Sequence, residues 1–464
     1  METKRPASAW LDQLGLDNTP LRPAVENSEK REGLRTTAIV GLLFMVMLGP
    51  IMTFGGVNLT SEGAVERQIG YVFLIGLVLY ASFPKATQFS LLAVPTPILV
   101  VFAWCLASLT WSLDPGSSVR RLALTMILAW TVFILVRHSR FNMIVDAVRW
   151  SLVAAIGLSY LVVFANPTTG IHAMADAAVP TAISGNWRGF LGHKNFAGAV
   201  CAICIILFTF DAKRFRPMVR WGIIAMAGYF LFRSESKTSA GMLVMAIMGG
   251  FMFETLSRRL RAYLIPLVTI SGSLIWLAAS AYGDFLTENF LNPTAFTGRG
   301  QIWSVLLRYA SDHPLLGAGF GSFWNIDGTS PVFVYGRGYV TEITVGHSGY
   351  LDQLVTVGVP GLLLMIFAVM IWPFFKLLVA GNLQAAQGAM IIALLMFCVG
   401  HNVTESGLFE RDAIVSTFLF LAAALAQKAT EGQTSPARRQ DAGGDEVMRA
   451  MRKRSKPIPA LLED

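Results

Sequence analysis

The feature that most constrains this chain is a series of apolar runs, each bounded by charged residues and each near the length of a bilayer-crossing helix. Such a helix needs about 17–25 predominantly apolar residues. Hydrophobic residues make up 54% of the sequence and charged residues only 14%, whereas soluble proteins contain about 25% charged residues. Because lipid offers no hydrogen-bond partners to an open backbone, the runs predict an all-α polytopic membrane protein.

The lengths of the runs predict about twelve transmembrane helices. The expected spans are 37–54, 69–83, 91–111, 121–136, 149–165, 195–210, 220–233, 239–256, 262–281, 358–378, 385–400 and 412–427. They divide the chain into a polar cytoplasmic N-terminal segment (1–36), the first nine spans (37–281), one large external loop (282–357), the last three spans (358–427) and a basic cytoplasmic tail (428–464).

Lysine and arginine gather in every second connection between the expected spans, which sets the orientation. Cytoplasmic connections of membrane proteins carry an excess of these residues, so the N-terminus and the tail are predicted to lie inside. The external segments are then 55–68, 112–120, 166–194, 234–238, 282–357 and 401–411. The net charge of +8 follows from this topology, and no nucleic-acid partner is predicted. The polar first 36 residues indicate no cleavable signal.

The longest external segment, 282–357, is rich in glycine and aromatic residues. It contains a stretch of helical pattern, GRGQIWSVLLRYASDHP, which ends at Asp312-His313-Pro314. Loops of this length between helices are usually functional. We therefore expect a folded external cap, with Arg308 as a solvated charge and His313 as a turn residue.

Cationic and histidine side chains converge on the predicted outer face. The candidate residues are Arg188, His193, Lys194, Asn195, Lys237, Arg299, His347, His401, Asn402 and Glu405. Charges at the ends of membrane helices are costly and need a reason, which an anionic ligand supplies, because arginine matches phosphate oxygens with a planar fork. Lys194 and Lys237 also fit a structural interpretation, in which they extend to the membrane interface. No role is predicted for His138 and His172.

The sequence holds no HExxH, DxD or Walker motif and no multi-cysteine set, so no metal or nucleotide cofactor is predicted. All four cysteines lie within apolar runs. Cys201 and Cys204 form a CxxC pair, but the surrounding segment AVCAICIILF offers no further ligands, so we interpret them as small buried residues.

Four short motifs resemble one family. His347-Ser348, followed after nine residues by Gly358-Val359-Pro360-Gly361, resembles the H-[NSQ]-x9-G-x-x-[GTY] signature of bacterial O-antigen ligases and Wzy-type polysaccharide polymerases. The segments RGFLGHKN (188–195) and SKTS (236–239) resemble the exopolysaccharide-polymerase branch, and GR--IW (298–303) resembles the start of the family's large external loop. All four lie on the predicted outer face, in the family's order.

The resemblance implies a glycosyltransferase at the periplasmic face of a bacterial inner membrane. Its donor would be a saccharide on undecaprenyl pyrophosphate. Its acceptor would be a sugar hydroxyl, either on a lipid-linked repeat unit, for a polymerase, or on lipid A core, for a ligase. Such enzymes need neither metal nor nucleotide sugar and act among membrane lipids. The resemblance is compatible with partners from the same pathway, namely a flippase and a chain-length regulator.

The resemblance also implies roles for the candidate residues. His347 would be the general base, and Arg299 and Arg188 would stabilise the pyrophosphate, helped by Lys194 or Lys237. His401 and Glu405 would orient the acceptor or support His347, and the remaining substrate-binding residues would be His193, Asn195 and Asn402. A base on one face and a leaving group on the other predicts inversion at the anomeric carbon.

Alternatives remain open at this point. The polymerase is preferred because of the GHKN and SKT pieces, and the first alternative is the ligase. A transporter, such as a lipid-saccharide flippase, is the second, although transporters place polar residues near the bilayer midplane. Arg299 also has a structural alternative, in which it neutralises a carboxylate such as Glu288 or Asp284 and holds the cap in place.

Overall fold

The computed structural model describes residues 21–48, 53–54, 57–58, 65–83, 93–172, 183–288, 299–381, 383–411 and 413–431. The first 20 residues, most of the predicted external segment 55–68 and the predicted basic tail beyond residue 431 lie outside them. Within the described residues the regular structure is helical, apart from a two-residue antiparallel pairing of β1 (Thr53–Phe54) with β2 (Val57–Asn58). The predicted all-α class is confirmed.

The helices follow one another along the chain with these bounds: α2 (Leu21–Leu48), α3 (Val65–Ser82), α4 (Thr96–Ala107), η3 (Ser108–Thr110), α5 (Pro115–His138), α6 (Phe141–Ala165), α7 (Pro167–Gly170), α8 (Lys194–Thr209), α9 (Pro217–Ser234), α10 (Lys237–Thr255), α11 (Arg258–Glu288), α12 (Arg299–Asp312), η5 (Asp327–Thr329), α13 (Val332–Tyr335), η6 (Gly338–Glu342), α14 (Gly349–Ile366), η7 (Phe367–Ile371), α15 (Trp372–Val379), α16 (Ala385–His401) and α17 (Ile414–Glu431).

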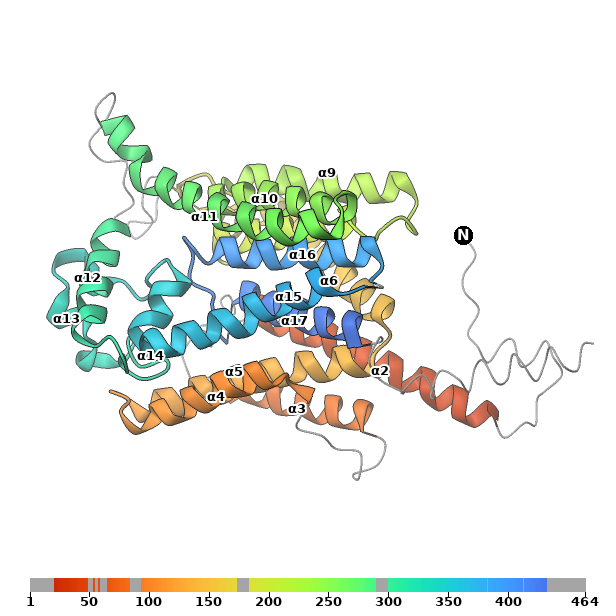
Figure 1. Ribbon diagram of the computed structural model, residues 1–464, viewed down its shortest axis with the longest axis horizontal. Helices are drawn as coiled ribbons and strands as arrows, with labels where there is room; N and C mark the ends of the chain where they lie inside the picture. The colour runs from red at the N-terminus through yellow and green to blue at the C-terminus, as the bar shows by residue number, and fades with distance from the viewer. Residues whose placement is uncertain are drawn as a thin grey trace, which may run out of the picture.

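The long helices run side by side along one direction, and α12 and α13 lie together at one end of them (Figure 1). Two helices form the centre of the bundle: α16 packs against α10 and α17, and α17 packs against α5. Thirteen of the 17 residues of α16 and 13 of the 18 residues of α17 are buried. A helix that is apolar on all sides is stable only when neighbours surround it, which explains why the last two apolar runs occupy the core.

Five helical segments are long and apolar enough to cross a membrane. They are Pro115–His138, Phe141–Ala165, Lys237–Thr255, Gly349–Val379 and Ile414–Glu431, and four shorter apolar helices accompany them. The chain is therefore an integral membrane protein. Each of the predicted spans contains at least part of a helix. Among the described residues, however, only these five helical segments have the length and composition needed to cross a membrane.

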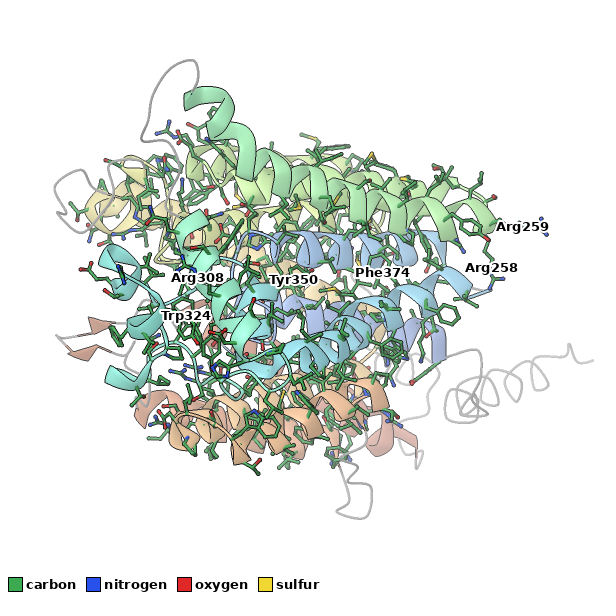
Figure 2. All side chains as sticks on the ribbon, turned by 60° about the vertical axis from the view of Figure 1, so that its left-hand side comes forward. Arg258, Arg259, Arg308, Trp324, Tyr350 and Phe374 are labelled. Carbon is green, nitrogen blue, oxygen red and sulfur yellow. The ribbon has the colours of Figure 1, made fainter. Side chains whose placement is uncertain are left out.

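The predicted external segments 112–120 and 282–357 meet at one end of the bundle, which we call the cap end. The backbone N–H of Leu113 donates to the carbonyl of Ala318 at 3.0 Å. Arg121, at the start of α5, donates to the carbonyl of Trp324 at 2.7 Å. Trp324 and Arg308 lie at this end, opposite Arg258 and Arg259 (Figure 2).

The predicted cytoplasmic connections meet at the opposite end, which we call the basic end. Lys428, near the end of α17, donates to the carbonyl of Arg137 at 3.0 Å. The N–H of Arg140 donates to Glu32 of α2 at 2.7 Å. The segments that the charge pattern assigns to opposite sides of a membrane therefore meet at opposite ends of the bundle.

The α14 helix begins at Gly349, earlier than the predicted span at 358, and is broken at Gly358. Gly358 has φ +68° and ψ −178°, a conformation that side chains other than glycine rarely adopt. A Cβ there would stand 2.2 Å from the carbonyl oxygen of Leu315. The break lets the N–H of Val359 donate to the carbonyl of Pro314 at 2.8 Å, which ties the cap to the bundle. The motif glycine therefore has a structural reason.

A carboxylate-centred candidate active site

Glu405, in the connection between α16 and α17, is the centre of a polar cluster at the cap end. Its Oε1 accepts hydrogen bonds from Asn195 Nδ2 at 2.7 Å and from Arg299 Nη2 at 2.8 Å. The Nδ1 atom of His347 lies 4.0 Å from its Oε2. The three partners come from the first turn of α8, the first turn of α12 and the turn before α14, so one carboxylate joins three distant segments.

Glu405 is a stable anion in this setting. Burial raises the pKa of its carboxyl group, but His347 at its side and the positive charges of Arg299 and His401 outweigh burial, and the pKa falls to about 2. Only 12% of the Glu405 side chain is exposed, against 31% for His347 and 22% for Arg299. The carboxylate is thus the most buried of the three side chains, and the histidine and the arginine are more accessible to solvent.

His347 sits in a turn that its neighbours hold in place. Its φ of +52° is uncommon for a residue other than glycine, and such strain persists only where the surroundings determine it. The N–H of Gly346 donates to Asp352 Oδ1 at 3.0 Å. The N–H of Gly349 donates to the carbonyl of Glu405 at 3.0 Å. The turn before α14 and the 401–405 connection therefore position each other.

Asp352 is a positioning residue that the sequence analysis did not select. Besides Gly346, it accepts a hydrogen bond from Trp324 Nε1 at 2.8 Å and one from the hydroxyl of Ser406. These donors belong to the cap loop, to the turn of His347 and to the residue after Glu405. The signal that could have found it is an acidic residue in an otherwise apolar helix, because such residues are expensive in a membrane.

Two histidines satisfy the free N–H groups at the start of α8. His193 caps the helix, with its Nδ1 accepting from the N–H of Asn195 at 3.2 Å. His172 Nε2 accepts from the N–H of Lys194 at 3.3 Å. Burial, aided by nearby Arg188, lowers the pKa of His172 to about 4, and burial also lowers the pKa of His193. Both rings therefore stay neutral near pH 7 and can accept; the sequence had assigned His172 no role.

The SKT turn contributes a chain of hydroxyl groups. Ser236 Oγ lies within hydrogen-bond distance of both Asn195 Oδ1, at 3.3 Å, and Ser239 Oγ, at 2.9 Å. Ser239 Oγ lies 3.3 Å from His401 Nε2, which places the turn between α8 and α16. Lys237 is exposed; burial lowers the pKa of its neighbour Lys194, and the charge of Lys237 adds to that lowering.

Not every candidate faces Glu405. Arg188 donates to the carbonyls of Thr169 at 2.7 Å and Thr168 at 3.3 Å, beside His172 rather than at the carboxylate. Asn402 is fully buried, and its Nδ2 donates to the carbonyl of Cys398 at 2.8 Å, so its contacts are structural. The roles of the candidate residues toward a substrate stay predictions.

Arg299 does pair with a carboxylate, as its structural alternative requires, but the carboxylate is Glu405. The side chains of Asp284 and Glu288, the partners first considered, lie outside the described residues. Within the described ranges Arg299 makes this single hydrogen bond, through Nη2. Its Nε and Nη1 therefore have no hydrogen-bond partner among the described residues.

Comparison with known proteins agrees with the motifs. Residues 222–366 match the family model described as O-antigen ligase. The chain is also 25% identical over 242 residues to the exopolysaccharide production protein ExoQ of Rhizobium meliloti (strain 1021). The resemblance to the O-antigen ligase and Wzy-type family is confirmed. The alignment covers 48% of this chain and 52% of ExoQ, so the chain matches about half the length of that relative.

The O-antigen ligase match includes the SKT turn, α12, the His347 turn and all of α14, whose last residue is also the last of the match. The RGFLGHKN segment and Glu405 lie outside it. In the structure these outer pieces join the matched ones at Glu405. Asn195 and the matched residue Arg299 both donate to the Glu405 carboxylate, and the matched residue His347 lies 4.0 Å from it.

Within the described parts of the chain, no group of three or more His, Cys, Asp or Glu side chains is arranged to hold a metal ion. The four cysteines are buried and unpaired by disulfides. The independence from metal remains a prediction that needs an activity measurement.

Proposed function

We propose that this integral membrane protein is a polysaccharide polymerase, which transfers saccharides from undecaprenyl pyrophosphate at the periplasmic face of a bacterial inner membrane. The observation that carries the proposal is the junction at Glu405. It brings a histidine and an arginine from two family motifs, and an asparagine from a third, to one point at the cap end. That point combines a candidate base with candidate anion-binding groups, as this transfer requires.

The donor pyrophosphate would lie against the cations of the cluster. Lys194 and Arg299 are close enough for their charges to interact, and Lys237 adds a third charge beside Lys194. Arg299 lies in the first turn of α12, where free N–H groups also favour an anion. As the anomeric C–O bond breaks, negative charge grows on the leaving pyrophosphate, and these groups stabilise it. Arg188 sits farther back, beside His172, and would contribute through its field.

His347 would act as the general base toward the acceptor hydroxyl. Its Nδ1 faces Glu405, so Nε2 is the atom available for the hydroxyl proton. The acceptor oxygen forms the new bond to the anomeric carbon, the old bond to pyrophosphate breaks, and its electron pair leaves with the lipid pyrophosphate. The proton goes to His347, where the Glu405 carboxylate stabilises the imidazolium that results. Attack opposite the leaving group inverts the anomeric carbon.

The proposed topology has about twelve spans with residues 282–357 as the external cap. Its support is the separation of the two ends: the predicted external segments bind one another around Glu405, and the basic connections bind one another at the far end. The positive-inside rule then puts the basic end in the cytoplasm.

A ligase that joins the saccharide to lipid A core is the second candidate. The matching family model is described as O-antigen ligase, which favours it. The GHKN and SKT pieces and the similarity to an exopolysaccharide production protein favour the polymerase. Both reactions use the same donor and the same base.

The saccharides made by a deletion strain test the proposal. We expect loss of polymer while single lipid-linked repeat units are still made, with recovery on supplying the wild-type gene and not the His347→Ala variant. Polymer that accumulates on lipid but is missing from lipid A core would instead establish the ligase. Unchanged saccharides, or loss of single repeat units on the outer face, would contradict both transferases.

A further inference from the structure

A cavity of about 310 Å³ lies beside Glu405 and His347 at the cap end. Its lining includes the immediate neighbours of the cluster: Phe196 follows Asn195, Ser406 follows Glu405, and Val345 and Gly349 flank the His347 turn. The cavity therefore borders the turn that carries the candidate base. Its volume is at the lower end of the range for small-molecule sites, roughly 300–1,000 Å³.

Aromatic rings form much of the cavity lining. Phe320 and Phe409 are buried, whereas Phe196 and Trp324 are partly exposed. The Trp324 indole is anchored by its Nε1 hydrogen bond to Asp352, so its ring is held in a fixed orientation. A fixed aromatic face with one wet side suits a ligand that is apolar on its flat face and polar at its edge.

The charges of the cavity are balanced, unlike those around Lys194 and Arg299. Arg121 donates to the carbonyls of Trp324 and Asn325, at 2.7 and 3.1 Å. Arg411 pairs with Glu410 at 3.2 Å. Together with Asp352, the lining carries two basic and two acidic residues. A pyrophosphate here would lie near two carboxylates, so the cavity does not favour an anion.

We infer that this cavity is the subsite for the accepting sugar, and that Trp324 is the platform on which an uncharged sugar ring rests. The inference deepens the proposed function and rests on it for the role of His347. The C–H face of a sugar ring is apolar and packs on an aromatic ring, while its hydroxyl groups point outward from the edge. The exposed residues Asn325 and Thr344 supply polar groups at the rim.

The test is the binding of two separate probes to the purified full-length protein, measured by calorimetry. The probes are the repeat-unit oligosaccharide released from its lipid and undecaprenyl pyrophosphate alone. Trp324→Leu should weaken oligosaccharide binding about tenfold or more, the loss expected for one aromatic platform, and leave undecaprenyl pyrophosphate binding unchanged. Trp324→Phe, which keeps a ring but loses the bond to Asp352, should retain most oligosaccharide binding.

Trp111→Leu is the matched control, because Trp111 also donates its indole N–H to a cap carbonyl, that of Leu316, at 3.0 Å, but does not line the cavity. It should bind both probes normally. Unchanged oligosaccharide binding in Trp324→Leu, equal losses in Trp324→Leu and Trp324→Phe, or no oligosaccharide binding by the wild type would overturn the inference. Failure of the wild type to bind undecaprenyl pyrophosphate would instead count against the proposed function.

Discussion

The two ends of the bundle use their charged residues differently. At the basic end, Arg149 is fully buried and donates to the carbonyls of Leu207, Phe210 and Asp211, at 2.9, 3.0 and 3.0 Å. Leu207 lies in the last turn of α8, and Phe210 and Asp211 directly follow the helix, so the arginine satisfies carbonyl groups at and just beyond the helix C-terminus. In the Glu405 cluster at the cap end, Arg299 instead binds the carboxylate, and His347 lies 4.0 Å from it.

The difference separates structural cations from candidate functional ones. A cation whose donors are used by backbone carbonyls, as in Arg149, has little left for a ligand. Arg299 uses one donor on Glu405 and has no other hydrogen-bond partner among the described residues, whereas Lys194 donates to the carbonyl of Glu235 at 3.4 Å. We therefore propose Arg299 as the cation at the cap end that binds an anionic ligand.

The largest effect that sharpens this comparison is expected from Glu405→Gln. It removes the negative charge that joins Arg299 and stabilises protonated His347, so polymer formation should fall roughly 10²–10⁴-fold, the usual contribution of general acid–base catalysis. Asp146→Asn is the counterpart at the basic end, where Asp146 pairs with Arg149 and Arg214. The Asp146 side chain is 33% exposed, and Arg149 keeps its three carbonyl partners without it, so polymer formation by Asp146→Asn should stay normal. Equal losses of polymer formation in Glu405→Gln and Asp146→Asn, at matched protein levels, would contradict the distinction between the two ends.

A smaller but sharper effect is expected from Arg299→Lys. A lysine can keep the ion pair with Glu405 but lacks the planar fork for two phosphate oxygens, so activity should drop at least about tenfold. Arg308→Lys, on the same helix, is the control and should be active. If Arg299→Lys made polymer at the wild-type rate, Arg299 would only hold the cap to the bundle, as its structural alternative states.

Glu405 and Asp352 show how much of this site could be predicted from the sequence. Histidine and arginine beside family motifs identified His347 and Arg299, and the charge pattern assigned these segments to one side. Glu405 was predicted to support His347 or orient the acceptor, but its contacts with Arg299 and Asn195 could not be predicted, because these partners lie 106 and 210 residues away in the sequence. Asp352 and His172 were missed because their contacts are backbone N–H groups and an indole, which leave no motif.

The helices were predictable from apolar length alone, but their ends were not. The start of α14 at Gly349 depends on contacts between the cap and the broken helix at Gly358, which hydropathy does not record. Gly358 was singled out only because it belongs to the family signature that this segment resembles. The physical reason for a glycine there is the close approach of Leu315.

The smallest effect concerns acid stability. The pKa of Glu405 is lowered in the fold to about 2 from an ordinary 4.5. Its ionised form therefore adds stability that is present above about pH 4.5 and is lost as the pH falls toward 2. The melting temperature of the wild type should exceed that of Glu405→Gln at pH 7, and the gap should shrink below about pH 4.5. A gap that stays constant across this range would show that the charge of Glu405 does not stabilise the site.

We propose that His347, beside the Glu405 carboxylate, is the general base in a metal-independent transfer of saccharide from lipid pyrophosphate to the acceptor hydroxyl. The direct test uses purified protein in lipid vesicles with lipid-linked repeat units and excess chelator. We predict that polymer forms and that one undecaprenyl pyrophosphate is released for each glycosidic bond formed. The rate should fall roughly 10²–10⁴-fold in His347→Ala and stay normal in the turn variant His313→Ala. Activity that needs added Mg²⁺ or Mn²⁺, or that survives in His347→Ala, would contradict the account.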